Sequence, residues 1–345
     1  MSSGIVQLVC MGAQDEYIVG DPEISFFNSS YKRHSNFSQS IEKQVIHGAV
    51  KNNSLSTIKV ERSGDLLGYT YFTIDNGSQA MESSNWESLI ESVQLVIGGQ
   101  VIDEQDSSFC ENIAIDMLAQ NVSRSSNGPH PGGTASSSYF FPLRFFFCEG
   151  PQSALPLIAL QYHDVELRIR WGSSASSYNW ECHSNYYYLD NEERGNIASR
   201  SHDMLIYQVQ KNIGSGDHVQ NLNFNHPVKF IASSNNSGSS PLASETNRIK
   251  ISINGVDITT YKWSRPHFMD VTHYYHTNYV TSPDVFMHPF CLTTSINQPT
   301  GSLNFSRIEN AKIHSENEIL NDTIYAVNYN ILKIENGMAG LVYAN

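Results

Sequence analysis

Apolar and polar residues alternate along much of this 345-residue chain. In Val165–Trp171 every odd position is apolar and every even position is charged, which predicts a strand with one buried and one solvated face. Ile58–Glu61 and Ile249–Ile253 show the same period of two. Gly98-Gly99 and Asn254-Gly255 have the composition of two-residue hairpin loops, which need positive φ. Many short strands separated by turns predict antiparallel β-sandwiches or barrels.

Helices are expected to be few and short. The best candidates are Glu111–Gln120 and Asp190–Ser199, and the helix dipole favours Glu192-Glu193 at the start of the second. The longest apolar runs, such as Ala154–Leu160, are too short to span a bilayer. Ile5–Ala13 has no Lys or Arg before it and is interrupted by a glutamine, so a secretory signal peptide is not expected.

One arrangement of strands and turns occurs twice in the chain. Val93–Ile102 resembles Ile249–Ile258, because each has alternating apolar residues, a two-residue turn and a later isoleucine. A Phe-Pro-Leu segment and the strand Val165–Trp171 follow the first copy, while a Pro-Phe-Cys-Leu segment and a strand at Ala311–Ile313 follow the second. Short alternating runs also match by chance, and that is the alternative. We interpret the pattern as two copies of one all-β domain.

The predicted boundaries follow from this repeat. We expect an N-terminal segment at residues 1–26, a first sandwich domain at 27–212 and a second at 213–345. The Gly/Ser stretch Ile213–Asp217 is the expected linker.

Composition and charge exclude some functions. The net charge is −13, from 21 Lys and Arg against 34 Asp and Glu. Affinity for nucleic acid comes from basic residues that neutralise phosphates, and the densest basic cluster is only Lys32-Arg33-His34. Direct nucleic-acid binding is therefore not expected.

The five cysteines are scattered, with no C-x-x-C pair. That spacing favours reduced thiols over a disulfide framework or a zinc site. The residues are Cys10, Cys110, Cys148, Cys182 and Cys291.

No catalytic, cofactor-binding or metal site is predicted. The phosphate-binding glycine loops, the zinc-protease motif and the nucleophile elbow are all absent from the sequence. His267, His273 and His276 could suggest a metal, but their aromatic neighbours and the lack of nearby cysteines favour packing roles. His163-Asp164 could be part of a catalytic triad, but it opens an amphipathic strand and no serine partner is evident. We therefore expect no enzyme and no cofactor.

Glycan acceptors are the remaining candidate sites. Among several N-x-[ST] sequons, Asn121 and Asn235 lie in predicted loops and are the best candidates. Most such sequons arise by chance in a chain rich in Ser and Asn, so unmodified asparagines are the preferred interpretation.

Segments in order along the whole chain carry a family resemblance. They are Gln7–Tyr17, Gly20–Phe27, Tyr31–Phe37, Arg62–Leu66, Leu95–Asp103, Leu155–His163, Leu222–Pro227, Asn304–Ile308, Asn328–Leu332 and Gly337–Asn345. Together they resemble the major capsid proteins of nucleocytoplasmic large DNA viruses, such as those of algal viruses, iridoviruses and mimivirus relatives.

The resemblance implies two eight-stranded jelly rolls per chain and a homotrimer that forms a pseudo-hexagonal capsomer. Such capsomers tile an icosahedral shell in the virion, which is assembled in the host cytoplasm. The implied partners are the chain itself, neighbouring capsomers, minor capsid proteins, the penton and the side of the internal viral membrane. Residues 231–247 and 315–323 form shorter loops than the family usually has. The resemblance therefore leaves open whether the chain is the principal shell protein or a less abundant paralogue.

Two other functions fit parts of the sequence. Tyr186–Tyr188 and Tyr274-Tyr275 could stack on sugars in a carbohydrate-binding or glycan-processing sandwich protein, which has no need for a pseudo-hexagonal trimer. An internal scaffold at the viral membrane would favour an amphipathic helix, and none is evident.

Overall fold

The computed structural model describes residues 9–121, 124, 137–234, 240–278 and 285–344. The chain divides into two units, Met1–Asn36 and Phe37–Asn345. In the first unit the described residues form one helical turn, α2 (Glu16–Val19), and all of them have exposed side chains. Regular β-structure begins at Phe37, which is later than the expected domain start at residue 27.

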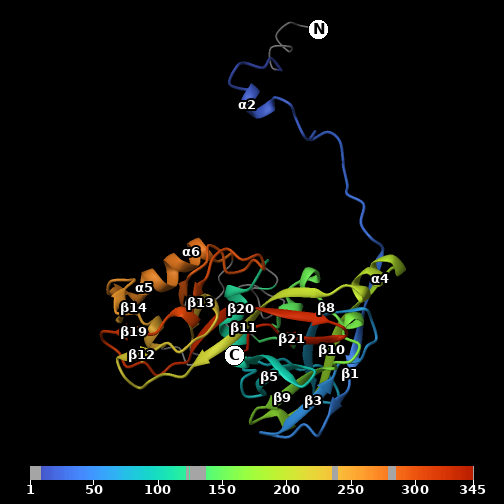
Figure 1. The fold of residues 1–345 in the computed structure, drawn as a ribbon. Coiled ribbons are helices and arrows are strands. Elements are labelled where there is room, and N and C mark those ends of the chain that lie inside the picture. The colour runs from blue at the N-terminus through green and yellow to red at the C-terminus, as the bar shows by residue number, and fades with distance from the viewer. Residues whose placement is uncertain (1–8, 122–123, 125–136, 235–239, 279–284, 345) are drawn as a thin grey trace. The chain divides into compact units, whose positions relative to one another are not determined.

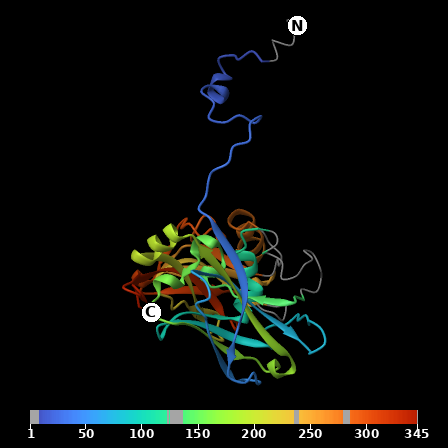
Figure 2. The ribbon, with the colours of Figure 1, turned by 90° about the vertical axis from the view of Figure 1, so that its right-hand side faces the viewer.

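The first half of the second unit folds as two antiparallel sheets (Figures 1 and 2). One sheet has the order β1 (Phe37–Gln44), β10 (Asn179–Leu189), β4 (Leu66–Asp75), β7 (Phe140–Pro142), and β8 (Leu155–Pro156) also pairs with β4. The other has the order β2 (Ile46–His47), β3 (Leu55–Lys59), β9 (Val165–Trp171), β5 (Ile90–Ile97), β6 (Gln100–Asp106).

The second half repeats this plan. One sheet has the order β11 (His202–Asn212), β20 (Ile324–Glu335), β13 (Pro227–Ser233), β17 (Phe286–Pro289), with β18 (Leu303–Asn304) on β13 and β21 (Met338–Leu341) on β20. The other has the order β12 (Val219–Asn221), β19 (Ala311–Ser315), β14 (Arg248–Ile253), β15 (Val256–Asp257), with β16 (Lys262–Trp263) on β14. The order β1-β10-β4-β7 corresponds to β11-β20-β13-β17, and β3-β9-β5-β6 corresponds to β12-β19-β14-β15, while β2, β16 and β21 have no counterpart. The shared strand order confirms the predicted duplication.

The register of the strands agrees as well as their order. Ile97 at the end of β5 pairs with Val165 of β9, and Ile253 at the end of β14 pairs with Ala311 of β19. The next residue donates its N–H across the sheet in both halves, with N···O distances of 3.0 Å for Gly98 and 2.7 Å for Asn254. Below, two residues are called equivalent when they occupy the same position in the pairing register of corresponding strands of the two halves.

The two hairpin turns have the backbone that their composition predicts. Gly98 and Gly99 have φ of 58° and 85°, while Asn254 and Gly255 have φ of 49° and 78°. Positive φ at both central residues defines a type I′ turn, whose twist matches that of paired strands. Gly or Asn is needed at these positions because other side chains are strained there.

Alternation correctly predicted the faces of β9. Its four odd-numbered residues are buried, while Glu166, Arg168 and Arg170 are half-buried or exposed. Trp171 at its end is fully buried, and its indole N–H donates to the Ser56 hydroxyl at 2.8 Å.

The helices are short and also repeat. A π-helical turn, η1 (Phe109–Ile113), precedes α3 (Ala114–Met117) in the first half, and η7 (His267–Val271) follows α5 (Ser264–Pro266) and precedes α6 (Thr272–His276) in the second. The helix expected at Asp190–Ser199 is α4 (Asn191–Ser199), with Asp190 as its N-cap. The remaining turns are 3-10 helices: η2 (Phe146–Cys148), η3 (Pro151–Ser153), η4 (Leu157–Ala159), η5 (Ala175–Ser177), η6 (Pro241–Ala243) and η8 (Phe305–Arg307).

β11 lies before the domain boundary expected at residue 213, but it belongs to the second half. β11 pairs along its whole length with β20, a strand of the second half. Ile213–Asp217, the expected linker, therefore connects β11 to β12 within the second half. Gly/Ser composition marks an exposed turn in both situations, so it does not distinguish a linker between domains from a loop within one.

The Gly98-Gly99 turn offers a test of the packing around it. An added Cβ at Gly98 would lie 2.2 Å from Nδ1 of His163, whereas one at Gly99 would have nothing within 4 Å. Both residues have positive φ, so the backbone strain of an alanine is common to both. Gly98→Ala should therefore lower the free energy of unfolding by about 1–3 kcal/mol more than Gly99→Ala, as overpacking does. Urea denaturation of both variants measures the difference, and equal losses would contradict the close approach to His163.

Candidate assembly surfaces

The residues considered for chemistry do not form a catalytic or metal site within the described part of the chain. No group of three or more His, Cys, Asp or Glu side chains is gathered there as metal ligands would be. His267, His273 and His276 lie on η7 and α6. Buried His273 interacts through Nδ1 with the Met269 carbonyl oxygen, and His276 Nδ1 lies 3.0 Å from the Leu292 carbonyl oxygen. His273 therefore attaches α6 to η7, and His276 attaches α6 to the loop that contains Leu292.

His163-Asp164 has a structural role. The N–H of Ala339 on β21 donates to Nδ1 of His163 at 3.1 Å, which links the C-terminal hairpin to the first half. The carboxylate of Asp164 lies 2.7 Å from Nζ of Lys59.

Glu192-Glu193 lie in the first turn of α4, as expected. No described helix is both long and apolar enough to cross a membrane.

Only one of the two candidate glycan acceptors lies among the described residues. Asn121 is exposed, and its Oδ1 accepts the N–H of Arg124 at 3.0 Å. Asn235 lies outside the described residues. Modification of either asparagine stays a prediction.

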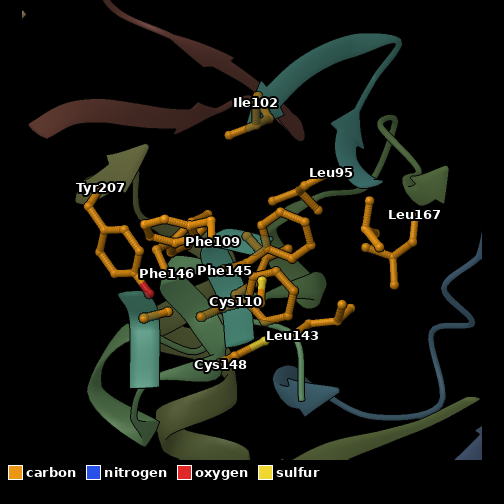
Figure 3. Packing of buried hydrophobic residues seen from close by; sticks show 14 of the residues in the cluster. Leu95, Ile102, Phe109, Cys110, Leu143, Phe145, Phe146, Cys148, Leu167 and Tyr207 are labelled. Carbon is orange, nitrogen blue, oxygen red and sulfur yellow. The ribbon is translucent and has the colours of Figure 1, made fainter. Parts of the chain in front are cut away.

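An internal contact joins the two halves of the chain, and we call it the seam. The outer face of the β11-β20-β13-β17 sheet is buried against β6 and η1 of the first half. Phe230, Met287 and Val327 on this face are fully buried in one core cluster with Phe109 of η1. The ring centroids of Phe109 and Tyr325 lie 5.6 Å apart. Figure 3 shows Tyr207 of β11 extending toward the part of this cluster that contains Phe109.

Polar contacts fix the register of the seam. The N–H of Val209 donates to Oδ1 of Asp103 at 2.9 Å, and the hydroxyl of Tyr207 donates to the Arg144 carbonyl oxygen at 2.8 Å. Gln208 Nε2 donates to the carbonyl oxygen of Ile102 on β6. These bonds bring the free edge of β11 alongside β6, so the two halves have a defined relative position.

Buried ionisable groups accompany these contacts. Burial raises the pKa of Asp103 to about 7, although the N–H groups of Val209 and Gln105 lower it. Burial also lowers the pKa of Lys229 on β13 to about 8. The Lys229 ammonium donates to the Ile296 carbonyl oxygen at 3.0 Å and lies 5.8 Å from the centre of the Tyr329 ring. Buried charges of this kind are sensitive to any loosening of the packing.

The equivalent face of the first half is open, and we call it the aromatic face. It consists of the outward side chains of the β1-β10-β4-β7 sheet: Ile41, Tyr69, Tyr71, Phe140 and His183. Phe140 is 41% exposed, whereas its equivalent Met287 is 0% exposed; Ile41 is 50% exposed, whereas its equivalent Tyr207 is 9% exposed. The Tyr71 ring stacks on His183 at 5.4 Å, and Tyr69, Tyr71 and Phe140 line a cavity of about 600 Å³.

The second half has an open counterpart of β6, η1 and α3, which we call the apolar ridge. It comprises Ile258, Val271, Tyr274, Tyr275 and Leu292. Ile258 is 44% exposed, whereas its equivalent Ile102 is buried under β11. Tyr274 and Tyr275 on α6 are 80% and 72% exposed, whereas all of α3 is buried. The sheet face of the first half and the ridge of the second half are therefore uncovered, whereas the equivalent surfaces are covered at the seam.

The sequence did not predict the aromatic face, and on the ridge it indicated only the Tyr274-Tyr275 pair. A signal was present in β4, where Leu66–Phe72 has apolar or aromatic residues on both faces of the strand. A strand that is apolar on both faces is typical of burial on both sides. The exposed rings of Tyr69 and Phe140 are therefore unusual for a surface that faces water.

These features define a double jelly-roll protein with two open apolar surfaces. Residues 25–207 match the family model of the major capsid protein N-terminus, and residues 193–340 match that of the large eukaryotic DNA virus major capsid protein. The chain is 32% identical to the major capsid protein of Pyramimonas orientalis virus and 30% identical to that of Paramecium bursaria Chlorella virus 1, in both cases over 100% of each chain.

The chain therefore belongs to the major capsid protein family of large eukaryotic DNA viruses. A solved structure agrees: the capsid protein VP54 of PBCV-1 superimposes with a TM-score of 0.78 and 26% identity, over 93% of this chain and 100% of that one. The Faustovirus major capsid protein shares the fold, with a TM-score of 0.68, 11% identity and 94% coverage of each chain. The protein is thus a structural component of a virion capsid, whose subunits associate with their neighbours.

Asp103 should make the stability of the seam depend on pH. Because its pKa is raised from 3.8 to about 7, the folded chain binds this proton more tightly than the unfolded chain. The stabilisation is fully present below about pH 4 and is lost as pH rises through about 7. Asp103→Asn should therefore reduce the fall in melting temperature between about pH 5 and about pH 8. Asp203→Asn, an exposed change on β11, is the control. An unaltered pH dependence in Asp103→Asn would contradict this role.

Proposed function

We propose that this chain is the subunit of a trimeric, pseudo-hexagonal capsomer in the icosahedral shell of a large DNA virus, either as the principal shell protein or as a less abundant paralogue. In this proposal it catalyses no reaction. The observation that carries the proposal is the pair of jelly rolls with matching strand order, packed through one seam. Three chains then supply six similar units, which approximate sixfold symmetry in a closed trimer. The number three comes from the family resemblance.

A closed trimer suits the two open surfaces. Within the chain, the seam covers one sheet face of the second jelly roll and one edge of the first. The matching face of the first jelly roll and the matching edge of the second are left for neighbouring chains. A ring in which every jelly roll contacts the next in the same way leaves neither surface exposed.

The domain boundaries in this proposal follow the strand pairing. The N-terminal segment extends to Asn36, where the first unit ends. The first jelly roll runs from β1 to β10, and the second begins with β11, because β11 is the equivalent of β1. The helix α4 then connects the two jelly rolls.

Other partners belong to the same proposal. Minor capsid proteins, the penton and the side of the internal membrane would meet the capsomer, and assembly would occur in the host cytoplasm. Direct binding to the genome is not part of the role, since the net charge of −13 opposes contact with phosphates.

The oligomeric state is the direct test. Three chains of 38.7 kDa together have a mass of about 116 kDa, which light scattering of the purified protein should find. Electron microscopy of the same material should show pseudo-hexagonal particles. A monomer at every concentration would contradict the proposal.

The cysteines allow a second test. Cys10 is exposed and the other four thiols are buried, and none of the five takes part in a disulfide within the described part of the chain. Burial raises the pKa of Cys148 to about 12, so this thiol stays protonated and unreactive at neutral pH. Reductant should leave the melting temperature and the gel mobility unchanged. A lower melting temperature on reduction would show that a disulfide stabilises the protein.

A further inference from the structure

A helical cap covers part of the core of the second jelly roll (Figure 1). It consists of α5, η7 and α6, which follow one another without a break over residues 264–276. Phe268 of the cap is buried, and its ring centroid lies 5.2 Å from that of Phe286 on β17. Tyr274 and Tyr275 of the apolar ridge belong to the same cap and are exposed. The packing of the cap therefore determines where these two rings of the ridge lie.

The side chain of His288 on β17 lies between two aromatic rings. Its ring centroid is 5.0 Å from that of Phe290 and 6.1 Å from that of Phe268 in the cap. Its charged neighbours are His276 of α6 and Lys262 of β16, where positive charge opposes a proton on His288. Burial, which is the larger effect, and these neighbours lower the pKa of His288 to about 4. The neutral ring is therefore the form that fits the closed cap.

A second histidine has the same preference. His273 of α6 is buried, and its Nδ1 donates to the Met269 carbonyl oxygen. Its Nε2 is also buried and has no hydrogen-bond partner within the described part of the chain. A proton on Nε2 would be a buried donor without an acceptor. Burial lowers the pKa of His273, although Asp116 of α3 and Asp270 of η7 raise it. Asp270 is also paired with Arg265, at 3.2 Å.

We propose that the cap is an acid-operated switch, which is closed while His288 is neutral and lifts from the second jelly roll when His288 binds a proton. In the open form the imidazolium reaches water, so it avoids the cost of burial. Opening moves Tyr274 and Tyr275 away from their places on the ridge. Acid then removes a surface that the capsomer needs for its neighbours, and this last step rests on the proposed function.

The direction of the pH effect follows from the two affinities for the proton. The closed form has the lower pKa, so the stability of the closed cap is lost as pH falls from about 6.5 toward about 4. Asp103 acts in the opposite direction, because its raised pKa strengthens the seam in acid. A mildly acidic solution should therefore open the cap while the two jelly rolls stay joined.

Hydrogen exchange followed by mass spectrometry tests the switch in the full chain. If opening restores the ordinary pKa of His288, the opening equilibrium rises about 30-fold between about pH 7.5 and about pH 5. Protection factors of peptides from residues 264–276 should fall by that factor, whereas those of β9 in the first jelly roll should not fall. Equal loss of protection in both places would mean general unfolding and would overturn the proposal.

A substitution at position 288 assigns the effect. His288→Phe places a ring that cannot titrate between Phe268 and Phe290, so only the contribution of His273 to the pH dependence should remain. His47→Phe is the matched control, because His47 is exposed on β2 in the first jelly roll. A full 30-fold change that persists in His288→Phe would show that another group operates the cap.

A surface substitution tests the same point if His288→Phe does not fold. Lys262→Gln removes a positive charge that opposes the proton on His288, so the loss of protection in acid should be smaller than in the wild type. Lys262→Arg keeps the charge and should behave as the wild type does. An equal loss in Lys262→Gln and Lys262→Arg would contradict the role of His288.

Light scattering separates this inference from the proposed function. Wild-type trimers that dissociate in mild acid, while His288→Phe trimers persist, are the expected result. Trimers whose cap keeps its protection in acid would overturn the switch and leave the capsomer role standing. A wild-type protein that forms no trimer at neutral pH would overturn the capsomer role, and hydrogen exchange of the cap would still decide whether the switch exists.

Discussion

Burial of an apolar sheet face between the two jelly rolls is the contact on which the rest of the structure depends. β13 is apolar on both sides: Ile231 points into the core of its own jelly roll, and Phe230 points into the seam. A sandwich with such a strand would expose a large apolar area if it stood alone. The second jelly roll therefore needs the first as a covering surface, and Phe37–Asn345 accordingly forms one compact unit.

Local patterns predicted the parts of the fold that local chemistry determines. The alternation in β9 and the turn residues at Gly98-Gly99 and Asn254-Gly255 act over a few positions, so the sequence alone was enough to place them. The duplication followed because the same local signals recur in the same order. The capsid family was reached through segments spread over the whole chain, and the family models confirmed it.

Features that depend on distant partners could not be predicted in this way. The membership of β11 is decided by hydrogen bonds to β20, more than a hundred residues later, and nothing in the residues of β11 specifies that partner. The Gly/Ser stretch after it has the composition of any exposed turn. The aromatic face was missed for a related reason: Tyr69 and Tyr71 alternate with buried residues, but alternation does not show which ring lies at the surface.

Covalent connection of the two jelly rolls through α4 has a consequence for the concentration at which a ring forms. A ring of six separate jelly rolls would require six molecules to meet, and every contact would depend on their concentration. In a ring of three chains, half of the contacts lie within a molecule, where the effective concentration of one side for the other is in the millimolar range or above. Those contacts persist at any dilution. In such a ring only the contacts between chains would depend on concentration, so the abundance of the protein would control assembly while each subunit stays folded.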